Sequence, residues 1–529
     1  MTVRRGLRVA VLASAAIVGG SGIAVMDVSS TAAAAPAGDV PDPDEARRCT
    51  SLLGSDVAGA RIASARFVAK ATKLPPLNVP VPNAFCQVRA TASAAPTSTI
   101  SVEIWLPQNW NSKLLGLGGS GTSGGLVLAP LTFPKPVSDG YATMATDAGH
   151  DNSERPVWAL KQPERIVDYG WRATQVGTRV AKALIARYYQ APAKRSYFQG
   201  CSNGGRDALM LAQRSPGEYD GIIAGAPANN MVSLFTNFAN YRHLIDQLPP
   251  ASLTPKLKFL HEAVLQKCDA LDGVKDGIVS SPGTCRFDPA VLSCKAGQDP
   301  NSCLSSREAT VIRTMYEGSR TRDGRLVHAG LPRGSEYLWD EWWTKPKSTG
   351  GSFAPDFFGY LVYDDPTWTM ASFDLARDWD AAKRKMSPVL DATDTDLRPF
   401  VRGGGKLLMY QGWDDQAVSP FNTIDYFKAS QQKLGKLAGG ARLFMVPGMG
   451  HCFDGKGLTS ADFVGELDRW VEGGKAPERI IAEKPVNFIL KAAGVEAPPL
   501  MTRPLCPFPK AARYLGKGSV NEAASFACR

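Results

Sequence analysis

One short motif restricts the folds open to this chain more than any other feature of its sequence. Residues 200–204, GCSNG, follow a strand-like run at 195–199 and precede an apolar helical run at 208–212. This is a G-x-S-x-G pattern in a strand–turn–helix context, where small flanking residues allow the strained turn that lifts a serine hydroxyl above a sheet. Ordinary tight turns also contain this pattern, but the context predicts that Ser202 is a nucleophile.

Strand-like and helical patterns alternate on both sides of this motif. The strand-like runs are 100–106, 113–117, 141–146, 406–411 and 442–446, and a helical pattern covers 166–189. Such alternation predicts an α/β fold, in which a mostly parallel sheet is covered by helices on both faces.

The composition and periodicity of the sequence change between residues 229 and 393. This stretch is irregular, holds four of the ten cysteines and is rich in aromatic residues. We interpret it as an inserted domain, flanked by two parts of one α/β domain at 38–228 and 394–529. The aromatic run within it comprises Trp339, Trp342, Trp343, Phe357, Phe358, Tyr360, Tyr363 and Trp368. Aromatic side chains supply large apolar areas, so most of these should form the core of the insertion.

A serine hydroxyl needs a base, and in α/β hydrolases the chain order is serine, acid, histidine. Four of the five histidines fall outside this order or within the insertion: His150, His243, His261 and His328. His451 lies in a glycine-rich loop after a strand-like run and is the base by elimination. The acid is expected on the loop after the preceding strand, where Asp414 and Asp415 are both candidates.

Catalysis by a serine also needs donors for the oxyanion. One is the backbone N–H of Asn203, and the second is expected in the glycine-rich loop after 113–117, at Gly119 or, next best, Gly118. Residues 116–121 also match the dinucleotide fingerprint G-x-G-x-x-G, which would indicate an oxidoreductase. Pro130 follows where the helix that binds the pyrophosphate should run, which weighs against this alternative.

An acidic loop in the insertion has the composition of a cation site. Asp269, Asp272 and Asp276 lie within eight residues and are interleaved with glycines. Calcium takes six to eight oxygen ligands with flexible geometry, so such a loop can wrap it. The spacing is not that of an EF-hand, and a plain Asp-Gly turn is the alternative.

The first 37 residues have the pattern of a secretory signal peptide. Arg4, Arg5 and Arg8 precede an apolar stretch, and residues 31–37 offer several A-x-A-like cleavage sites. The Arg4-Arg5 pair leaves the Sec and twin-arginine routes both open. These features predict a secreted or periplasmic protein, and no later apolar run of 18 residues predicts a membrane span.

Charge and cysteine content limit the classes of binding partner that we expect. The formal charge is +10, from 60 Lys and Arg against 50 Asp and Glu, but no run of five or six basic residues occurs. We therefore expect no nucleic-acid partner, and no membrane partner once the signal is removed. The ten cysteines form an even number, as expected in an oxidising compartment, and none has the C-x₂-C spacing of a metal site.

Taken together, these motifs resemble the tannase and feruloyl esterase family, which includes a mono(2-hydroxyethyl) terephthalate hydrolase. The matching residues are 200–205 (GCSNGG), 412–415 (GWDD) and 450–452 (GHC), and the resemblance covers nearly all of the chain after the signal. It implies an α/β-hydrolase fold in which the insertion is a lid over the serine. In the family the acid is the third residue after the glycine of the second motif, which selects Asp415. A proline often follows that acid, and Gln416 stands there in this chain.

The resemblance also implies structural features outside the triad. It implies a calcium site in the lid, held by Asp269, Asp272, Asp276 and the carbonyls of Val274 and Ile278. It further implies the disulfide bonds Cys49–Cys86, Cys201–Cys452, Cys268–Cys285, Cys294–Cys303 and Cys506–Cys528.

We therefore predict a secreted serine carboxylesterase that hydrolyses esters of aromatic carboxylic acids through an acyl-enzyme on Ser202. The acyl group is expected to be of the feruloyl, galloyl or terephthaloyl type, and no organic cofactor is expected. A secreted binding protein that keeps the hydrolase scaffold without catalysis is the alternative from another class. The presence of all three triad residues argues against it.

Overall fold

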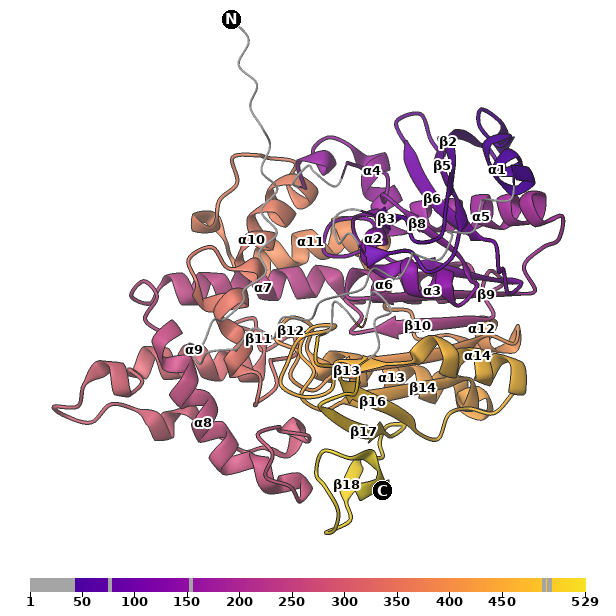
Figure 1. Ribbon diagram of the computed structural model, residues 1–529. Coiled ribbons are helices and arrows are strands. Elements are labelled where there is room, and N and C mark those ends of the chain that lie inside the picture. Colours follow the sequence, from indigo (N-terminus) through magenta and orange to yellow (C-terminus); the bar gives the residue numbers. More distant parts are fainter. Residues whose placement is uncertain (1–42, 75–78, 152–155, 488–490, 492–496) are drawn as a thin grey trace, which may run out of the picture. The chain divides into compact units, whose positions relative to one another are not determined.

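The computed structural model describes residues 43–74, 79–151, 156–487, 491 and 497–529 (Figure 1). The signal peptide predicted for residues 1–37 lies outside the described residues. Beyond the sheets and helices discussed below, the described chain includes α1 (Pro43–Thr50) and the short hairpin of β3 (Lys73–Leu74) and β4 (Val79–Pro80).

A central sheet of ten strands dominates the described part of the chain. In spatial order they are β1 (Asp56–Val57), β2 (Ala60–Val68), β5 (Phe85–Ala92), β6 (Ile100–Pro107), β8 (Ala142–Thr146), β7 (Lys113–Leu117), β9 (Arg195–Cys201), β10 (Gly221–Gly225), β13 (Lys406–Gly412) and β14 (Ala441–Val446). Pairs from β1 to β8 are antiparallel, whereas the six strands from β8 to β14 run parallel. The predicted mostly parallel α/β sheet is confirmed, and its strand boundaries follow the apolar runs closely.

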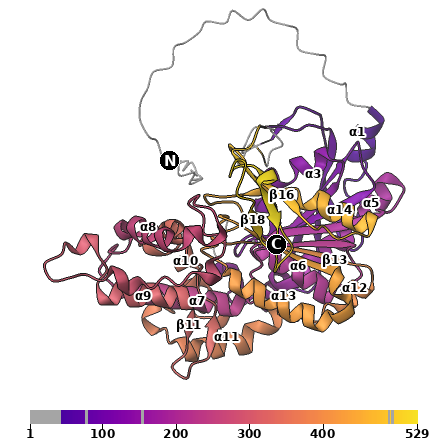
Figure 2. The same ribbon diagram turned by 90° about the horizontal axis from the view of Figure 1, so that it is seen from below.

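Helices cover both faces of this sheet (Figure 2). One face carries α5 (Ala173–Tyr189), α6 (Asn203–Arg214), α12 (Arg398–Arg402) and α13 (Pro420–Leu434), and the other carries α2 (Ala129–Thr132), α3 (Pro134–Ser138) and α14 (Phe463–Gly473). Side chains along each strand alternate between these two layers. In β13, Leu407 and Met409 pack toward α13, whereas Leu408 packs toward α14. Burial on both faces explains why these strands read as continuous apolar runs.

The helix predicted at 166–189 is present, but the structure starts it earlier and places a π-helical turn inside it. A short helix α4 (Pro163–Val167) and a π-helical turn (Asp168–Arg172) precede α5. The turn brings Gly170 so close to Val389 that a Cβ there would lie 2.6 Å from the Val389 carbonyl oxygen. It also aims the Tyr169 hydroxyl at the carbonyl of Gly121, 2.8 Å away. The π-turn therefore coincides with tertiary contacts in the middle of the helix, and π-turns of this kind often lie near functional sites.

The chain between β10 and β13 adds no strand to the central sheet among its described residues. It forms α7 (Met231–Asp246), α8 (Leu257–Cys268), α9 (Ser306–Glu317), α10 (Thr349–Asp356), α11 (Leu375–Leu390) and the two-stranded sheet of β11 (Ser319–Arg320) and β12 (Leu326–His328). These helices enclose an apolar core in which Trp339, Trp343 and Phe358 are fully buried. We call residues 229–393 the insertion; in Figure 1 it runs from magenta to orange.

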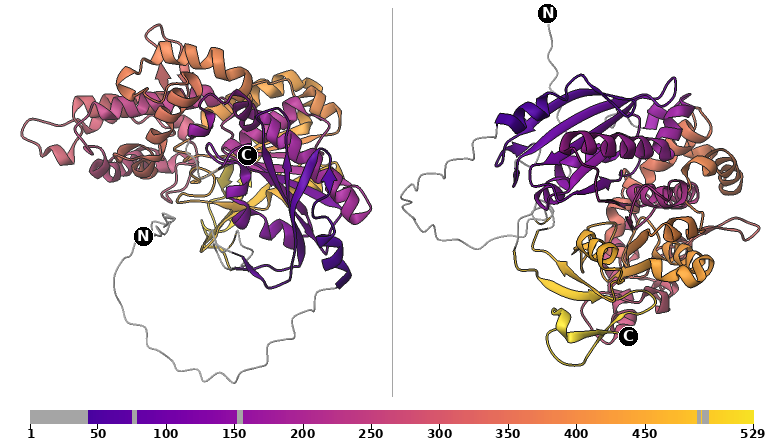
Figure 3. Two further views of the ribbon diagram at one scale, coloured as in Figure 1. Left: turned by 90° about the horizontal axis from the view of Figure 1, so that it is seen from above. Right: turned by 90° about the vertical axis from the view of Figure 1, so that its right-hand side faces the viewer.

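The C-terminal segment lies along the β14 edge of the central sheet (Figure 3, right). It contains a three-stranded sheet of β15 (Ser460–Ala461), β16 (Ile480–Lys484) and β17 (Met501–Leu505), followed by β18 (Ala512–Tyr514) and β19 (Phe526–Cys528). Phe508 N–H donates to the Leu443 carbonyl at 2.8 Å, which pairs this segment with β14. Every helix among the described residues is too short or too polar to cross a bilayer.

Candidate active site

A cavity of about 1200 Å³ opens at the carboxyl ends of the parallel strands. Ser202, Asn203 and His451 lie in its wall, together with the Gly118–Gly121 loop. Ligand sites in open α/β sheets form at this edge because the loops that leave the strands converge there. The predicted nucleophile and base therefore share one cavity, whereas the predicted acid Asp415 is fully buried and does not line it.

The strand–turn–helix motif exposes Ser202 at a strained turn. Ser202 separates β9 from α6 and adopts φ 61° and ψ −122°, a conformation that few non-glycine residues occupy. The turn is tight because a Cβ on Gly200 would lie 2.2 Å from the Gly204 carbonyl oxygen. Similarly, a Cβ on Gly118 would lie 2.6 Å from the Cα of Gly204. Glycine at these positions lets the loop after β7 approach the start of α6.

His451 connects Ser202 to Asp415. Its Nε2 lies 2.8 Å from Ser202 Oγ, and its Nδ1 lies 3.0 Å from Asp415 Oδ2. Asp415 is fully buried, and its other oxygen accepts the backbone N–H groups of Ala417 and Val418 at 2.9 and 2.8 Å. Burial lowers the pKa of His451, but the charge and hydrogen bond of Asp415 raise it, and the net shift is upward. This arrangement orients the imidazole and stabilises its protonated form.

Asp414 is adjacent in sequence but faces away from the histidine. Its Oδ2 accepts a hydrogen bond from the Tyr337 hydroxyl at 2.9 Å, and burial raises its pKa well above the usual range. Of the two candidate acids that the sequence pattern leaves open, the structure brings only Asp415 to His451.

The disulfide bonds in the described chain are the five that the resemblance implies. Cys201 and Cys452, which flank Ser202 and His451, are 251 residues apart in sequence and are bonded to each other. This bond holds the nucleophile turn and the histidine loop together. No free cysteine occurs among the described residues.

The predicted oxyanion donors differ in their present hydrogen bonds. Asn203 is the first residue of α6, so its N–H belongs to the unpaired first turn of that helix. Gly119 N–H instead donates to the buried carboxylate of Asp207 at 3.1 Å, and Gly118 N–H donates to the Gln199 carbonyl at 3.0 Å. Asn203 therefore presents a free donor, whereas the two glycine amides are already engaged.

The acidic loop of the insertion is held by hydrogen bonds of its own. Asp269 accepts the N–H groups of Asp276 and Gly277, and Asp276 accepts that of Ile278, all at 3.1 to 3.2 Å. Asp272 accepts the N–H of Val274 at 3.0 Å.

The environment of Asp276 carries excess negative charge. Asp276 Oδ2 lies 3.0 Å from Nη2 of Arg503. Burial raises the pKa of Asp276, Arg503 lowers it, and Asp272 and Asp269 raise it again, with a net upward shift. Among the described residues, no group of three or more His, Cys, Asp or Glu side chains is already arranged to hold a metal ion.

Three of the four remaining histidines, His150, His261 and His328, have structural surroundings. Burial lowers the pKa values of His150 and His328 to about 4, so both are neutral. His150 stacks on Trp158 and hydrogen-bonds the Thr122 carbonyl at 2.8 Å, which supports the loop after β7. His261 bonds Glu336 at 2.9 Å within the insertion. None of these three lines the cavity.

The apolar half of the cavity comes mainly from the insertion. Its wall contains Met231, Leu234, Phe235, Phe238, Trp342 and Phe353. Trp342 meets the His451 ring edge to face, with ring centroids 5.4 Å apart. Of the predicted aromatic run, Trp342 faces this cavity, whereas Trp343 and Phe358 are core residues. Phe235 and Phe238 lie on α7, and sequence reasoning missed them because they precede the aromatic run.

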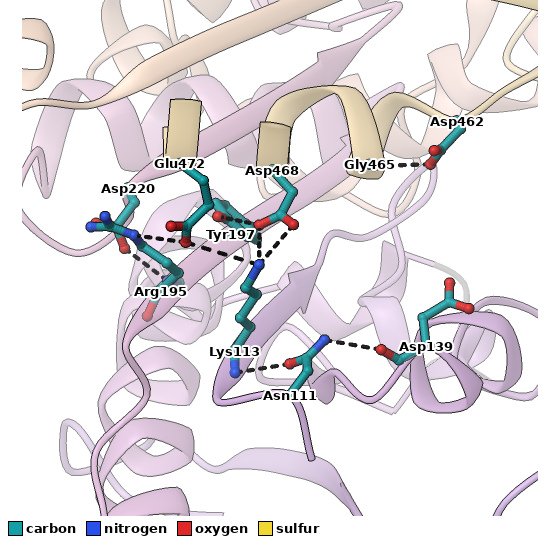
Figure 4. Close-up of polar contacts among 11 residues, drawn as sticks. Asn111, Lys113, Asp139, Arg195, Tyr197, Asp220, Asp462, Gly465, Asp468 and Glu472 are labelled. Carbon is teal, nitrogen blue, oxygen red and sulfur yellow. Dashed lines mark hydrogen bonds and ion pairs between the residues drawn. The ribbon is translucent and has the colours of Figure 1, made fainter. Parts of the chain in front are cut away.

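The other half of the cavity is polar. It lies over the face of the sheet that α5 and α6 do not cover. Its wall contains Asn111, Lys113, Lys135, Asp139, Tyr141, Asp462 and Asp468. Figure 4 shows Lys113 reaching from the start of β7 to Asp468 on α14, with Nζ–Oδ distances of 2.5 and 2.7 Å. No sequence pattern predicts this group, because its members come from segments far apart in the chain.

A further residue near the triad was also missed. Asp454 lines the cavity and accepts a hydrogen bond from Gln416 Nε2 at 3.1 Å, and Gln416 Oε1 accepts the His451 N–H at 3.1 Å. Burial raises the pKa of Asp454 to about 6, although His451 lowers it. Gln416, the departure from the proline seen in the resemblance, thus links Asp454 to the histidine loop.

The fold rules out a dinucleotide-binding site at the glycine-rich loop. The loop at 116–121 leads into a single 3₁₀ turn and the short helices α2 and α3, of four and five residues. A pyrophosphate site of that type needs a long helix directly after the glycines.

Comparisons with known proteins agree with this geometry. A family model described as tannase and feruloyl esterase matches residues 86–529. The chain is 33% identical over 496 residues to an uncharacterized esterase of Xanthomonas campestris pv. campestris, covering 84% of each chain. It is 32% identical over 500 residues to a mono(2-hydroxyethyl) terephthalate hydrolase of Piscinibacter sakaiensis, covering 81% of each. The crystal structure of feruloyl esterase B from Aspergillus oryzae superposes with a TM-score of 0.83 at 25% identity, covering 92% of this chain and all of that one.

Proposed function

This chain belongs to the tannase and feruloyl esterase family and is a carboxylic ester hydrolase, and we propose that it acts through an acyl-enzyme on Ser202. The observation that carries this proposal is the chain of hydrogen bonds from Ser202 Oγ through His451 to Asp415, at 2.8 and 3.0 Å. A strained serine and a base in one cavity, with a buried acid behind the base, are what nucleophilic ester hydrolysis needs.

In the acylation step, Ser202 Oγ attacks the ester carbonyl carbon while His451 Nε2 takes the hydroxyl proton. Asp415 stabilises the resulting imidazolium through Nδ1–H. His451 then donates the proton to the departing alkoxide oxygen, so the alcohol leaves and the acyl group stays on Ser202. In the second half, water attacks the acyl carbon with His451 as base, and the acid is released.

The negative oxygen of each tetrahedral intermediate needs donors that are already in place. We assign Asn203 N–H as the first, because its position at the start of α6 leaves it without an intrahelical acceptor. Gly119 N–H is the second, and this role requires it to share or exchange its hydrogen bond with Asp207. The positive end of α6 adds favourable electrostatics at the same place.

The acyl group is proposed to be an aromatic carboxylic acid of the feruloyl, galloyl or terephthaloyl type. Support comes from the apolar half of the cavity, whose Phe235, Phe238, Trp342 and Phe353 side chains offer flat apolar contact beside His451. A panel of hydroxycinnamoyl, galloyl and terephthaloyl esters, measured as kcat/KM, would identify the preferred acid.

A fluorophosphonate probe tests the proposed nucleophile directly. We expect covalent labelling of Ser202, found by peptide mapping, and loss of both labelling and turnover in Ser202→Ala. Labelling at another serine, or an unlabelled protein that still binds aromatic esters, would favour a binding protein on this scaffold.

The acidic loop is proposed to bind calcium, through Asp269, Asp272, Asp276 and the carbonyls of Val274 and Ile278. Support comes from three carboxylates that share one loop: burial raises the pKa of Asp276, and the charges of Asp272 and Asp269 raise it further. A divalent cation would neutralise this repulsion, and the Cys268–Cys285 bond closes the loop. Its contribution would be to the stability of the insertion.

Export is proposed on the basis of the N-terminal pattern and the five disulfide bonds. N-terminal sequencing of protein recovered outside the cytoplasm should find a start near residue 38. An unprocessed N-terminus on the exported protein would contradict the signal peptide.

A further inference from the structure

The oxyanion site beside Ser202 has few uncommitted backbone donors. The tetrahedral oxygen needs N–H groups that are aimed at it before the reaction starts. The backbone N–H of Asn203 is free at the start of α6. In the loop after β7, however, the N–H groups of Gly118, Gly119 and Ser120 all donate to acceptors within the protein, at 3.0 to 3.1 Å. A further donor at this place would therefore add directly to the stabilisation of the oxyanion.

The side chain of Asn203 carries such a donor. Asn203 is only 2% exposed and lines the cavity next to Ser202. A Cβ added to Gly119 would lie 2.9 Å from Asn203 Nδ2, so this nitrogen borders the glycine loop. Only Cβ and Cγ separate Nδ2 from the Cα of Asn203, which keeps the side-chain donor close to the backbone donor of the same residue. No acceptor among the described residues takes a hydrogen bond from Nδ2, so it remains available to a ligand.

Arg206 determines the orientation of this side-chain amide. Its Nε donates to Asn203 Oδ1 at 2.7 Å. An arginine side chain has only donors, so the atom that it contacts must be the amide oxygen, and the NH₂ group must be at the other end. Arg206 is itself fully buried and donates to four further acceptors at 2.7 to 3.2 Å, which are the carbonyl oxygens of Tyr169, Gly170 and Leu390 and the carboxylate of Asp207. The amide is therefore held in one orientation before a substrate binds.

Asp207 makes the Gly119 amide a less accessible donor than Asn203 Nδ2. One oxygen of this buried carboxylate accepts the Gly119 N–H at 3.1 Å, and the other accepts Arg206 Nη2 at 2.9 Å. Giving the Gly119 N–H to a substrate takes a hydrogen bond away from a buried oxygen, which has a cost in free energy. The NH₂ group of Asn203 incurs no such cost, because it gives up no bond within the protein.

We propose that the side chain of Asn203 is a catalytic residue, whose Nδ2–H donates to the tetrahedral oxygen together with the backbone N–H of Asn203, and that Arg206 positions it. This inference rests on the proposed serine esterase function. As Ser202 Oγ bonds to the carbonyl carbon and its proton passes to His451 Nε2, the carbonyl π pair moves to the oxygen, which becomes negative. The Nδ2–H bond to this oxygen then becomes charge-assisted, and it weakens again when the pair returns and the leaving group departs. Such a donor stabilises the transition state more than the planar ester.

Asn203→Asp separates the donor from the contact with Arg206. The variant keeps Oδ1 as the acceptor for Arg206 Nε but has an ionised oxygen, which cannot donate, in place of the NH₂ group. We expect kcat on an aromatic methyl ester to fall roughly 10²- to 10³-fold, the usual loss for one oxyanion donor, with little change in KM. The Tm should stay close to the wild-type value. Asn203→Ala removes the donor without adding a negative charge, so its kcat should fall by a similar factor.

Inhibitor binding distinguishes a catalytic role from a structural one. An aryl trifluoromethyl ketone forms a tetrahedral oxyanion adduct with a serine, whereas the matching aromatic carboxylic acid is planar. In both Asn203 variants, Ki for the ketone should rise at least about tenfold relative to Ki for the acid, because only the adduct uses the oxyanion donors. Asn237→Ala is the matched control: Asn237 is also buried, but its Oδ1 accepts the Ser319 hydroxyl within the insertion and it does not line the cavity. This control should lower Tm and leave both kcat and the Ki ratio at their wild-type values.

Two results would overturn the assignment. One is a kcat for Asn203→Ala within about threefold of the wild-type value, since this would attribute any loss in Asn203→Asp to its added charge. The other is an unchanged Ki ratio in either variant. A wild-type protein that neither hydrolyses aromatic esters nor forms an adduct with the ketone would instead refute the proposed function.

Discussion

Replacing Asp415 by asparagine should impair catalysis far more than the same change at Asp414. In the wild type, Asp415 Oδ1 accepts two backbone N–H groups, and Oδ2 accepts Gln411 Nε2 and His451 Nδ1. An asparagine has only one oxygen, and two backbone donors fix it on the Oδ1 side. The NH₂ group of the asparagine then faces Nδ1 of His451. Because both groups cannot donate to each other, Nδ1 must be unprotonated and the ring carries its proton on Nε2.

Nε2–H is the wrong tautomer, because Nε2 must accept the Ser202 proton. In triads of this kind the error costs about 10⁴-fold in kcat, equivalent to about 5.4 kcal/mol of transition-state stabilisation. At Asp414, burial already raises the pKa far above the usual range, so its neutral acid is close in shape and charge to asparagine. Tyr337 can still hydrogen-bond the remaining oxygen. We therefore expect Asp414→Asn to change kcat by less than about fivefold.

Steady-state kinetics on one aromatic methyl ester would measure both variants, with Tm values recorded to exclude unfolding. Comparable kcat losses at the two positions would refute the reasoning. So would an Asp415→Asn enzyme that retains a tenth of wild-type kcat.

Three other perturbations test the surrounding structure. Asp454→Asn removes a carboxylate that raises the pKa of His451, so the acidic limb of the kcat/KM profile should move to lower pH and kcat at its plateau should fall. Asp425→Asn, at an exposed position of α13, should leave the limb in place, and an unmoved limb in Asp454→Asn would contradict the role. Chelation of calcium should lower Tm, since an ion at a hundredfold excess over Kd stabilises the folded state by about 2.7 kcal/mol. The Asp276→Asn variant should show a smaller shift. An unchanged Tm, together with no calcium by elemental analysis, would refute the proposed calcium site. Cys201→Ala/Cys452→Ala should fold with the other four disulfides intact. Its kcat should fall much more than its KM rises, because a 1 Å misplacement of reacting groups costs on the order of 10²-fold in rate. Full activity in this variant would show that the bond does not position the two loops.

Local patterns in the sequence were sufficient for part of this site. The strand–turn–helix around Ser202 and the glycine-rich loop at His451 are built from contiguous residues, so their geometry is set by backbone rules that a sequence reveals. The apolar runs likewise predicted five of the six parallel strands, because strands buried on both faces have no polar alternation to obscure them. The sixth, β10, was not predicted.

Other features depend on which distant segments meet, and only the tertiary structure decided them. Sequence pattern alone left Asp414 and Asp415 equivalent, since adjacent residues on a turn point in different directions, and the N–H groups of Ala417 and Val418 determine which carboxylate meets His451. A π-turn at Asp168–Arg172 lies within a continuous helical pattern, at the point where Gly170 approaches Val389. Tyr141, Lys113 and Asp468 form the polar half of the cavity only because strand order and the packing of α14 bring them together. Periodicity records which face a residue occupies within its own element, but it carries no information about the partner across the fold.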